Sequence, residues 1–143
     1  ALALLLVDID SFKAYNDHFG HQQGDSCLTM VAQELAGMLK RPADLAARYG
    51  GEEFAAVLPE TTLEQARVLA DRIRAHVAGL GLQQAPAAHH PQVTLSIGVS
   101  AFDRARLNAP EALIEAADKA LYAAKRGGRN RVVADGDEVD AAA

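Results

Sequence analysis

Residues 48–54 read Arg-Tyr-Gly-Gly-Glu-Glu-Phe, and this stretch decides the fold predicted for the rest of the chain. The flanking residues are apolar enough to form two strands, and Gly50 and Gly51 supply the positive φ that a two-residue hairpin turn requires. The sequence therefore predicts a tight β-hairpin that carries Glu52 and Glu53 where the chain reverses. Acids at a turn are ordinarily just solvated, so a function for this pair requires a second acidic cluster facing it.

A second acidic cluster follows the first predicted strand. Residues 2–7 form a continuous apolar run, which is typical of a central strand covered on both faces, and the run ends at Asp8 and Asp10. If this strand lies beside the hairpin, Asp8 and the Glu52-Glu53 pair can meet and hold Mg²⁺, which prefers hard oxygen ligands. Two such ions about 3.5–4 Å apart could activate an attacking oxygen and stabilise a leaving one. Alternatively Asp8 only ends a strand; for Asp10 we expect an N-cap of the following helix.

The other predicted elements follow from periodicity and capping signals. Strands are expected over residues 2–7, 45–49, 54–58, 93–99 and 131–134. A short helix is expected over residues 12–19, and a longer one from Asp25 or Ser26 to the break at Arg41-Pro42. A third helix should follow the capping box in residues 61–65, and a fourth should run from a cap at Asn108 with Glu111 to Gly127. A hairpin among the crossovers predicts an α+β fold, with a mostly antiparallel sheet and helices on one side.

Composition sets the limits for the whole chain. Its 143 residues, 50% of them hydrophobic, suit one domain over residues 1–134, followed by an acidic and Ala-rich tail over residues 135–143. The net charge of -5 argues against a nucleic-acid partner. A single cysteine, Cys27, argues against disulfides and for a reducing, cytoplasmic location. No stretch is long enough to span a membrane, so no membrane contact is expected, and a start without Met suggests a domain cut from a longer protein.

Several basic residues are candidates for binding phosphate. Lys125 and Arg129 belong to an interrupted basic run, and Lys13 follows the first acidic cluster. The alternatives are a solvated lysine and a helix C-terminus that attracts cations. The chain lacks the GxxxxGK[ST] pattern, which excludes a P-loop. His89 and His90 lie in a predicted loop, where solvated histidines or an adventitious metal are the alternatives, and they receive no function.

Four motifs in order resemble those of the GGDEF-domain diguanylate cyclases, and the likeness covers residues 4–133. They are DIDSFKAYND at residues 8–17, similar to DxDxFKxxND; HQQGD at residues 21–25, similar to HxxGD; GGEEF at residues 50–54, a common form of the signature; and ALYAAK with GRN at residues 120–125 and 128–130.

This resemblance implies a ferredoxin-like, palm-type nucleotidyl-cyclase fold and the condensation of two GTP into cyclic di-GMP and two pyrophosphates. Asp8, the carbonyl of Ile9 and Glu52 would hold two Mg²⁺ per GTP, or Mn²⁺ in their place. Glu52 and Glu53 would be the catalytic residues, with Glu52 the candidate base for the 3′-hydroxyl. The product's symmetry implies a homodimer, because each domain holds one GTP.

The resemblance also assigns residues to the substrate and to the product. Asn16 and Asp25 would bind guanine. The remaining substrate-binding residues would be Phe12, Lys13, Gly50, Gly51, Lys125 and Arg129. An RxxD motif, Arg41 and Asp44, would with Arg72 form an inhibitory site for cyclic di-GMP; the alternative is a local ion pair.

Two rival functions stay open at this point. A non-catalytic sensor of GTP or cyclic di-GMP would ordinarily carry a degraded signature, whereas residues 50–54 are complete. Another palm-type cyclase would make a mononucleotide product, and a guanine clamp argues against an adenine substrate. The family's DxLTxLxNR lead-in is absent from this sequence, which leaves dimer geometry and part of the substrate pocket unspecified.

Overall fold

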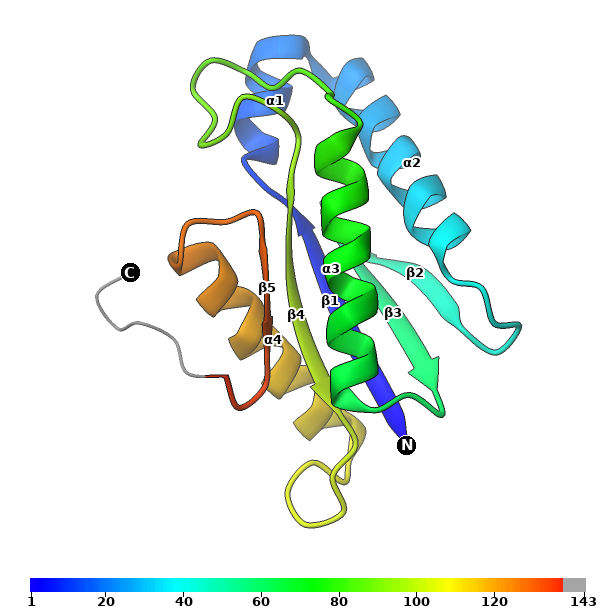
Figure 1. Ribbon diagram of the computed structural model, residues 1–143. Helices are drawn as coiled ribbons and strands as arrows, with labels where there is room; N and C mark the ends of the chain where they lie inside the picture. The colour runs from blue at the N-terminus through cyan, green and yellow to red at the C-terminus, as the bar shows by residue number, and fades with distance from the viewer. Residues whose placement is uncertain (138–143) are drawn as a thin grey trace.

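The sheet is organised around β1, which carries Asp8 and Ile9 at its C-terminal end. The computed structural model describes residues 1–137. The elements are β1 (Leu2–Ile9), α1 (Phe12–Phe19), α2 (His21–Met38), β2 (Leu45–Gly50), β3 (Glu53–Pro59), α3 (Leu63–Gly79), β4 (Leu95–Ala101), α4 (Pro110–Arg126) and β5 (Arg131–Ala134). The strand order is β2-β3-β1-β4-β5, and only the β4–β5 pair is parallel (Figure 1). The predicted α+β fold with a mostly antiparallel sheet is confirmed.

Helices cover both faces of the sheet, so the expectation of helices on one side was wrong. Alternate side chains of β1 point in opposite directions. Leu5 and Val7 pack into the cluster that contains residues of α2 and α3, whereas Leu4 and Leu6 pack against α4 (Figure 1). A strand that is apolar at every position needs cover on both sides, and α4 supplies the second layer.

The hairpin turn lies one residue later than predicted. β2 extends to Gly50, and Gly51 and Glu52 form the turn. Of the two glycines only Gly51 has a positive φ, at 49°. The β2–β3 register shifts between Arg48 and Gly50, which accommodates this displacement. As a result Glu52 lies in the turn itself, and Glu53 is the first residue of β3.

The helix boundaries agree with the sequence in part. The capping box of α3 is present, with Thr62 as the N-cap. α2 begins at His21, earlier than predicted, because Gly20 with φ 90° both ends α1 and opens α2. The predicted Asn108 cap of α4 is wrong, since Pro110 begins the helix and Asn108 donates to a loop carbonyl. No helix within residues 1–137 is long and apolar enough to cross a membrane.

The beginning of the predicted tail packs on the domain. The carboxylate of Asp137 accepts two hydrogen bonds from the Arg67 guanidinium of α3, both at 2.6 Å, and a third from the backbone of Ala134 at 2.9 Å. The rest of the predicted tail, residues 138–143, lies outside the described residues. The division into a domain over 1–134 and a tail stays a prediction.

Candidate active site

Acids from the two predicted clusters meet at one end of the sheet. β1 and β3 pair antiparallel with Asp8 opposite Glu53, and the Ile9 amide donates to the Glu52 carbonyl at 3.3 Å. Asp8 is buried, with 4% of its surface exposed, whereas Glu52 and Glu53 are half-buried. The predicted proximity of the first strand and the hairpin is therefore confirmed.

Lys125 neutralises part of this negative charge. Its Nζ lies 2.5 Å from Asp8 Oδ2, which brings the C-terminal end of α4 to the acids. Burial, with smaller contributions from the charges of Glu52 and Glu53, raises the pKa of Asp8 to about 6 against the opposing effect of Lys125. Burial would lower the pKa of Lys125, but Asp8 and the two glutamates hold it above its usual value. The site is thus a partly desolvated acidic cluster that favours cations.

The donor set fits a hard divalent cation. Within residues 1–137 no three histidine, cysteine or acidic side chains converge as a complete metal cage. Mg²⁺ does not require one, since it commonly takes one or two carboxylates and fills its shell with water and phosphate oxygens. Asp8 and Glu52 offer carboxylates and Ile9 a carbonyl. The pKa of Asp8 is raised by burial and, to a smaller extent, by the neighbouring glutamates, and a bound cation would offset both effects.

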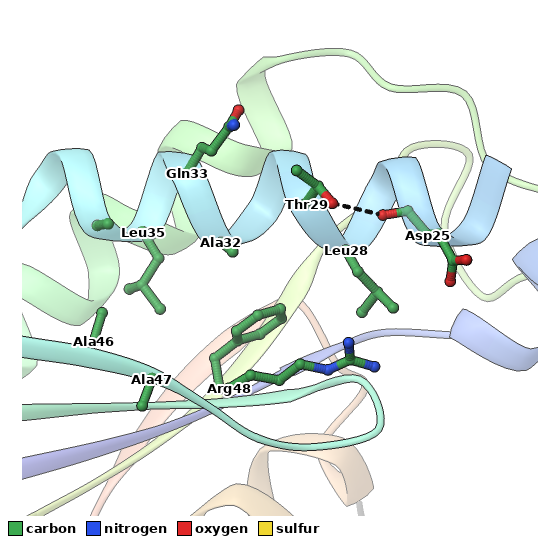
Figure 2. Close-up of a pocket in the computed structure, with 11 residues that line it drawn as sticks. Asp25, Leu28, Thr29, Ala32, Gln33, Leu35, Ala46, Ala47 and Arg48 are labelled. Carbon is green, nitrogen blue, oxygen red and sulfur yellow. Dashed lines mark hydrogen bonds between the residues drawn. The ribbon is translucent and has the colours of Figure 1, made fainter. Parts of the chain in front are cut away.

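A cavity of about 580 Å³ opens between α2 and the β2–β3 hairpin. Figure 2 shows Asp25 of α2 and Arg48 of β2 at the same end of this cavity, with Leu28 and Ala32 along its length. Asp25 is exposed. Arg48 had no predicted role, although its side chain lines this cavity and donates to the Gly51 carbonyl at 2.9 Å. Only the fold could reveal it, because an arginine before a turn is not distinctive.

Asn16 sits beside the start of α2 with an unused acceptor. Its Oδ1 is buried and has no hydrogen-bond partner among residues 1–137. A Cβ at Gly24 would lie 1.7 Å from this oxygen, so Gly24 makes the room that the side chain occupies. The predicted guanine residues thus lie on adjacent helices, Asn16 on α1 and Asp25 on α2. Phe12 is the first residue of α1, and its side chain is buried in the hydrophobic core beneath these two helices.

The predicted phosphate residues Lys13 and Arg129 share a second cavity, of about 570 Å³, with Ser11 and His89. Lys13 is almost fully exposed and forms an ion pair with Asp17 at 3.0 Å. Arg129 has a positive φ of 64° in the turn that follows α4. The structure therefore brings Lys13 and Arg129 to one rim and places Lys125 at the acidic cluster.

Asp10 does not cap a helix, so that prediction was wrong. Ser11 occupies the N-cap position of α1 and makes no side-chain cap. The Asp10 carboxylate is buried instead and accepts hydrogen bonds from the Ser96 and Thr94 hydroxyls, at 2.6 and 2.7 Å, and from the Asn130 amide at 3.0 Å. These partners were missed, although polar side chains on a strand covered on both faces require partners of this kind.

The RxxD residues lie at the opposite end of the hairpin strands. The Arg41 guanidinium donates to the Pro59 carbonyl at 2.6 Å and lies 3.6 Å from Asp44. Asp44 Oδ1 is buried and has no hydrogen-bond partner in the described part of the chain. Arg72 lies on α3 and lines a separate hollow with Val68 and Asp71. The structure thus joins Arg41 to Asp44, whereas Arg72 lines another surface.

The His89-His90 loop bridges two parts of this site. The amide of His89 donates to the Ser11 hydroxyl at 3.3 Å, and the His90 ring donates to the Gly128 carbonyl at 3.0 Å. The loop therefore contacts both the β1–α1 junction and the turn after α4. Neither contact could be expected from the loop's sequence alone.

Comparison with known proteins identifies relatives of the whole domain. The family described as "Diguanylate cyclase, GGDEF domain" matches residues 1–131. The response regulator PleD of Caulobacter vibrioides is 47% identical over 132 residues, which are 92% of this chain and 29% of that protein. Diguanylate cyclase DgcP of Pseudomonas aeruginosa is 46% identical over 131 residues, 92% of this chain and 19% of that protein. The chain thus spans less than a third of these relatives.

Solved structures of GGDEF domains also resemble this chain, at lower sequence identity. The GGDEF domain of DgcB from Caulobacter crescentus, in complex with c-di-GMP, has a TM-score of 0.84 and 36% identity, covering 95% of this chain and 78% of that chain. The active GGEEF domain of a diguanylate cyclase from Vibrio cholerae has a TM-score of 0.82 and 34% identity, covering 96% and 84%.

Proposed function

The chain belongs to the GGDEF family of diguanylate cyclase domains, and we propose that it condenses two GTP molecules into cyclic di-GMP with release of two pyrophosphates. The observation that carries the proposal is the meeting of Asp8, Lys125 and a complete Gly-Gly-Glu-Glu-Phe turn at one end of the sheet. A non-catalytic sensor would have no need for both carboxylates of this turn beside a buried acid.

The reaction is a phosphoryl transfer in which the 3′-hydroxyl of one GTP attacks the α-phosphate of the other in line. Glu52, at the tip of the turn, accepts the proton of that hydroxyl. Lys125 and Arg129 bind phosphate oxygens, and Lys13 stands at the same rim as Arg129. Positioning and charge compensation are the main contributions that the protein makes to such a reaction.

Asp8, the Ile9 carbonyl and Glu52 would hold the Mg²⁺ ions, with Glu53 nearby. When bound, Mg²⁺ supplies positive charge that stabilises the phosphates and the leaving pyrophosphate. Lys125 compensates the buried charge of Asp8 without the metal. The test of the proposed function is chromatographic analysis of products after incubation of the domain with GTP and Mg²⁺ at high protein concentration.

Asn16 and Asp25 bind the guanine base. An Asp25 carboxylate can accept from the ring N–H and the amino group of guanine, and the otherwise unsatisfied Asn16 Oδ1 offers a further acceptor. Adenine lacks both of those donors, so it would leave these acceptors without partners once the base covers them.

Gly24→Ala is expected to weaken GTP binding by about 1–3 kcal/mol, the cost of losing a satisfied polar contact. The new Cβ would overlap Asn16 Oδ1, which is the end of a flexible side chain, so Asn16 can turn away while the fold persists. Equilibrium binding of a non-reactive GTP analogue measures the effect. Gly37→Ala is the control on the same helix, because its Cβ would meet no atom within 4 Å. Equal affinities in the two variants would contradict the role of Asn16.

A two-fold dimer follows from the symmetry of the product, because each domain supplies half of the site. We therefore expect the specific activity of this domain to rise with protein concentration. Initial rates over a hundredfold range of concentration, paired with sedimentation analysis, measure this dependence. Rates strictly proportional to the amount of enzyme would contradict assembly from two halves.

Arg41 and Asp44 are proposed to bind cyclic di-GMP as an inhibitory site, with Arg72 a further contact. Arginine can donate to guanine O6 and N7 together, and half of the Arg41 side chain is exposed. Arg41→Ala is expected to lower product affinity by about 1–3 kcal/mol and to relieve feedback inhibition. Titration calorimetry with cyclic di-GMP measures this, and Lys40→Ala is the control for loss of a neighbouring charge. Unchanged product affinity in Arg41→Ala would rule out this site.

A further inference from the structure

Asp10 connects the end of β1 to the turn that follows α4. Its carboxylate is fully engaged, with Oδ1 accepting from Ser96 at 2.6 Å and Oδ2 accepting from Thr94 at 2.7 Å and from the Asn130 amide at 3.0 Å. It is 5% exposed and lies two residues beyond Asp8. With both oxygens occupied, Asp10 has a different task from Asp8, whose carboxylate contacts Lys125.

The turn held by Asp10 has an unfavourable backbone. Arg129 and Asn130 are consecutive residues with positive φ, 64° and 46°, a conformation that side chains other than glycine rarely adopt. Such a turn persists when surrounding contacts determine it. Three side chains from other parts of the chain hold it: Asp10 through the Asn130 amide, His90 through the Gly128 carbonyl at 3.0 Å, and Arg74 through Asn130 Oδ1 at 2.9 Å.

Of these three contacts, the one with Asp10 is made to a buried carboxylate. A charged acceptor makes a stronger hydrogen bond than a neutral one, and burial strengthens it further. The histidine contact is exposed, the arginine contact is partly buried like that of Asp10, and both have neutral oxygen acceptors. If the Asn130 amide lost its hydrogen bond to Asp10, the strained turn would lose its contact with a buried side chain. Arg129 would be displaced with it, because it is the residue directly before Asn130.

We infer that Asp10 is a positioning residue, which fixes the Gly128–Asn130 turn so that Arg129 stands at the rim of the cavity it shares with Lys13. This inference rests on the proposed function, in which Arg129 binds the phosphates of GTP. Asp10 touches neither substrate nor metal in this scheme. It determines how well the enzyme holds the triphosphate, whereas Asn16 and Asp25 bind the base independently.

The first test is amide hydrogen exchange of the wild-type domain. The Asn130 amide is expected to exchange as slowly as the central amides of β4, because it donates to a buried carboxylate. Exchange at the rate of an exposed loop would overturn the inference. This measurement needs no variant, so it decides the question even if replacement of Asp10 prevents folding.

The second test compares two nucleotides in Asp10→Asn. Asparagine keeps the side-chain volume but offers one acceptor oxygen in place of two. At least one of the three donors, which are the Asn130 amide and the hydroxyls of Thr94 and Ser96, therefore loses its acceptor. The probes are GTP with a methylene bridge between its α- and β-phosphorus atoms, which cannot release pyrophosphate, and GMP, which has the base without the triphosphate. We expect the affinity for the analogue to fall by about tenfold and that for GMP to change by less than about twofold. Thr94→Val is the matched control, because it removes one donor to Asp10 and leaves the turn attached.

A double-mutant cycle with Arg129→Ala distinguishes positioning of Arg129 by Asp10 from a general loss of structure in the domain. If Asp10 acts through Arg129, Asp10→Asn will lower analogue affinity little further once Arg129 is gone. Additive losses, or equal losses for the analogue and GMP, would overturn the inference. A wild-type domain that binds both probes but makes no cyclic di-GMP would contradict the proposed function and leave this inference to be decided by binding. A wild-type domain that binds GMP and the analogue equally would contradict the role of Arg129, and the inference with it.

Discussion

Glu52→Ala is expected to lower the formation of cyclic di-GMP from GTP by at least about a hundredfold, the loss typical of removing a group that acts in the transition state. In the proposed mechanism Glu52 has two roles, as a ligand of Mg²⁺ and as the base for the 3′-hydroxyl. The fold should survive, because Glu52 lies in a turn and is half-buried. Chromatographic product analysis at high protein concentration, with Mg²⁺ in excess, measures the change.

The control for this prediction is Glu115→Ala, which removes an exposed carboxylate from α4 away from the turn. It should leave product formation unchanged. Activity retained in Glu52→Ala would contradict the assigned metal site and base together. If the wild-type domain itself forms no product, it should be joined into a forced dimer. Restored turnover would trace the inactivity to weak assembly, whereas continued inactivity would favour a binding module over an enzyme.

The parts of the site that could be predicted are those fixed by local sequence. The Gly-Gly pair sets the hairpin, and the apolar run before Asp8 marks a central strand, so their proximity follows from the fold class. The same apolar run also implies that both faces of the strand are covered, and the expectation of helices on one side did not take this into account. A second covering layer could therefore be predicted from residues 2–7, although not that α4 supplies it.

What could not be predicted depends on contacts between distant segments. Asp10 before a helix fits an N-cap by position, but the polar side chains of Thr94 and Ser96 compete for the same carboxylate and prevail. An amide more than a hundred residues away completes the set. Capping rules consider only neighbours in sequence, so they favoured the wrong partner for a carboxylate buried at the meeting of three segments.

Gly98→Ala should lower the free energy of unfolding more than Gly24→Ala or Gly37→Ala does. Gly98 lies in the middle of β4, beside β1, and faces α4. A Cβ there would lie 2.1 Å from the Ala117 carbonyl oxygen and 2.4 Å from the Leu121 amide nitrogen, both backbone atoms of α4. We expect a loss of about 3 kcal/mol or more, at or beyond the upper end of the usual range for overpacking. Thermal and urea unfolding measure it, with Gly79→Ala, whose Cβ has open space, as the control.

The reason for the large cost is that the three atoms nearest to a Cβ at Gly98 belong to the helix backbone, which cannot rotate away. At Gly24 the obstructing atom is the end of a side chain, so that substitution should affect binding more than stability. At Gly98 the whole of α4 must move off the sheet, which opens the cluster that Leu113 and Leu121 form with β1. Leu121→Ala should therefore fail to rescue Gly98→Ala and should destabilise it further, because it removes apolar contact without relieving the backbone overlap. Rescue by Leu121→Ala would show that a side chain, and not the helix backbone, limits the approach of α4 to β4.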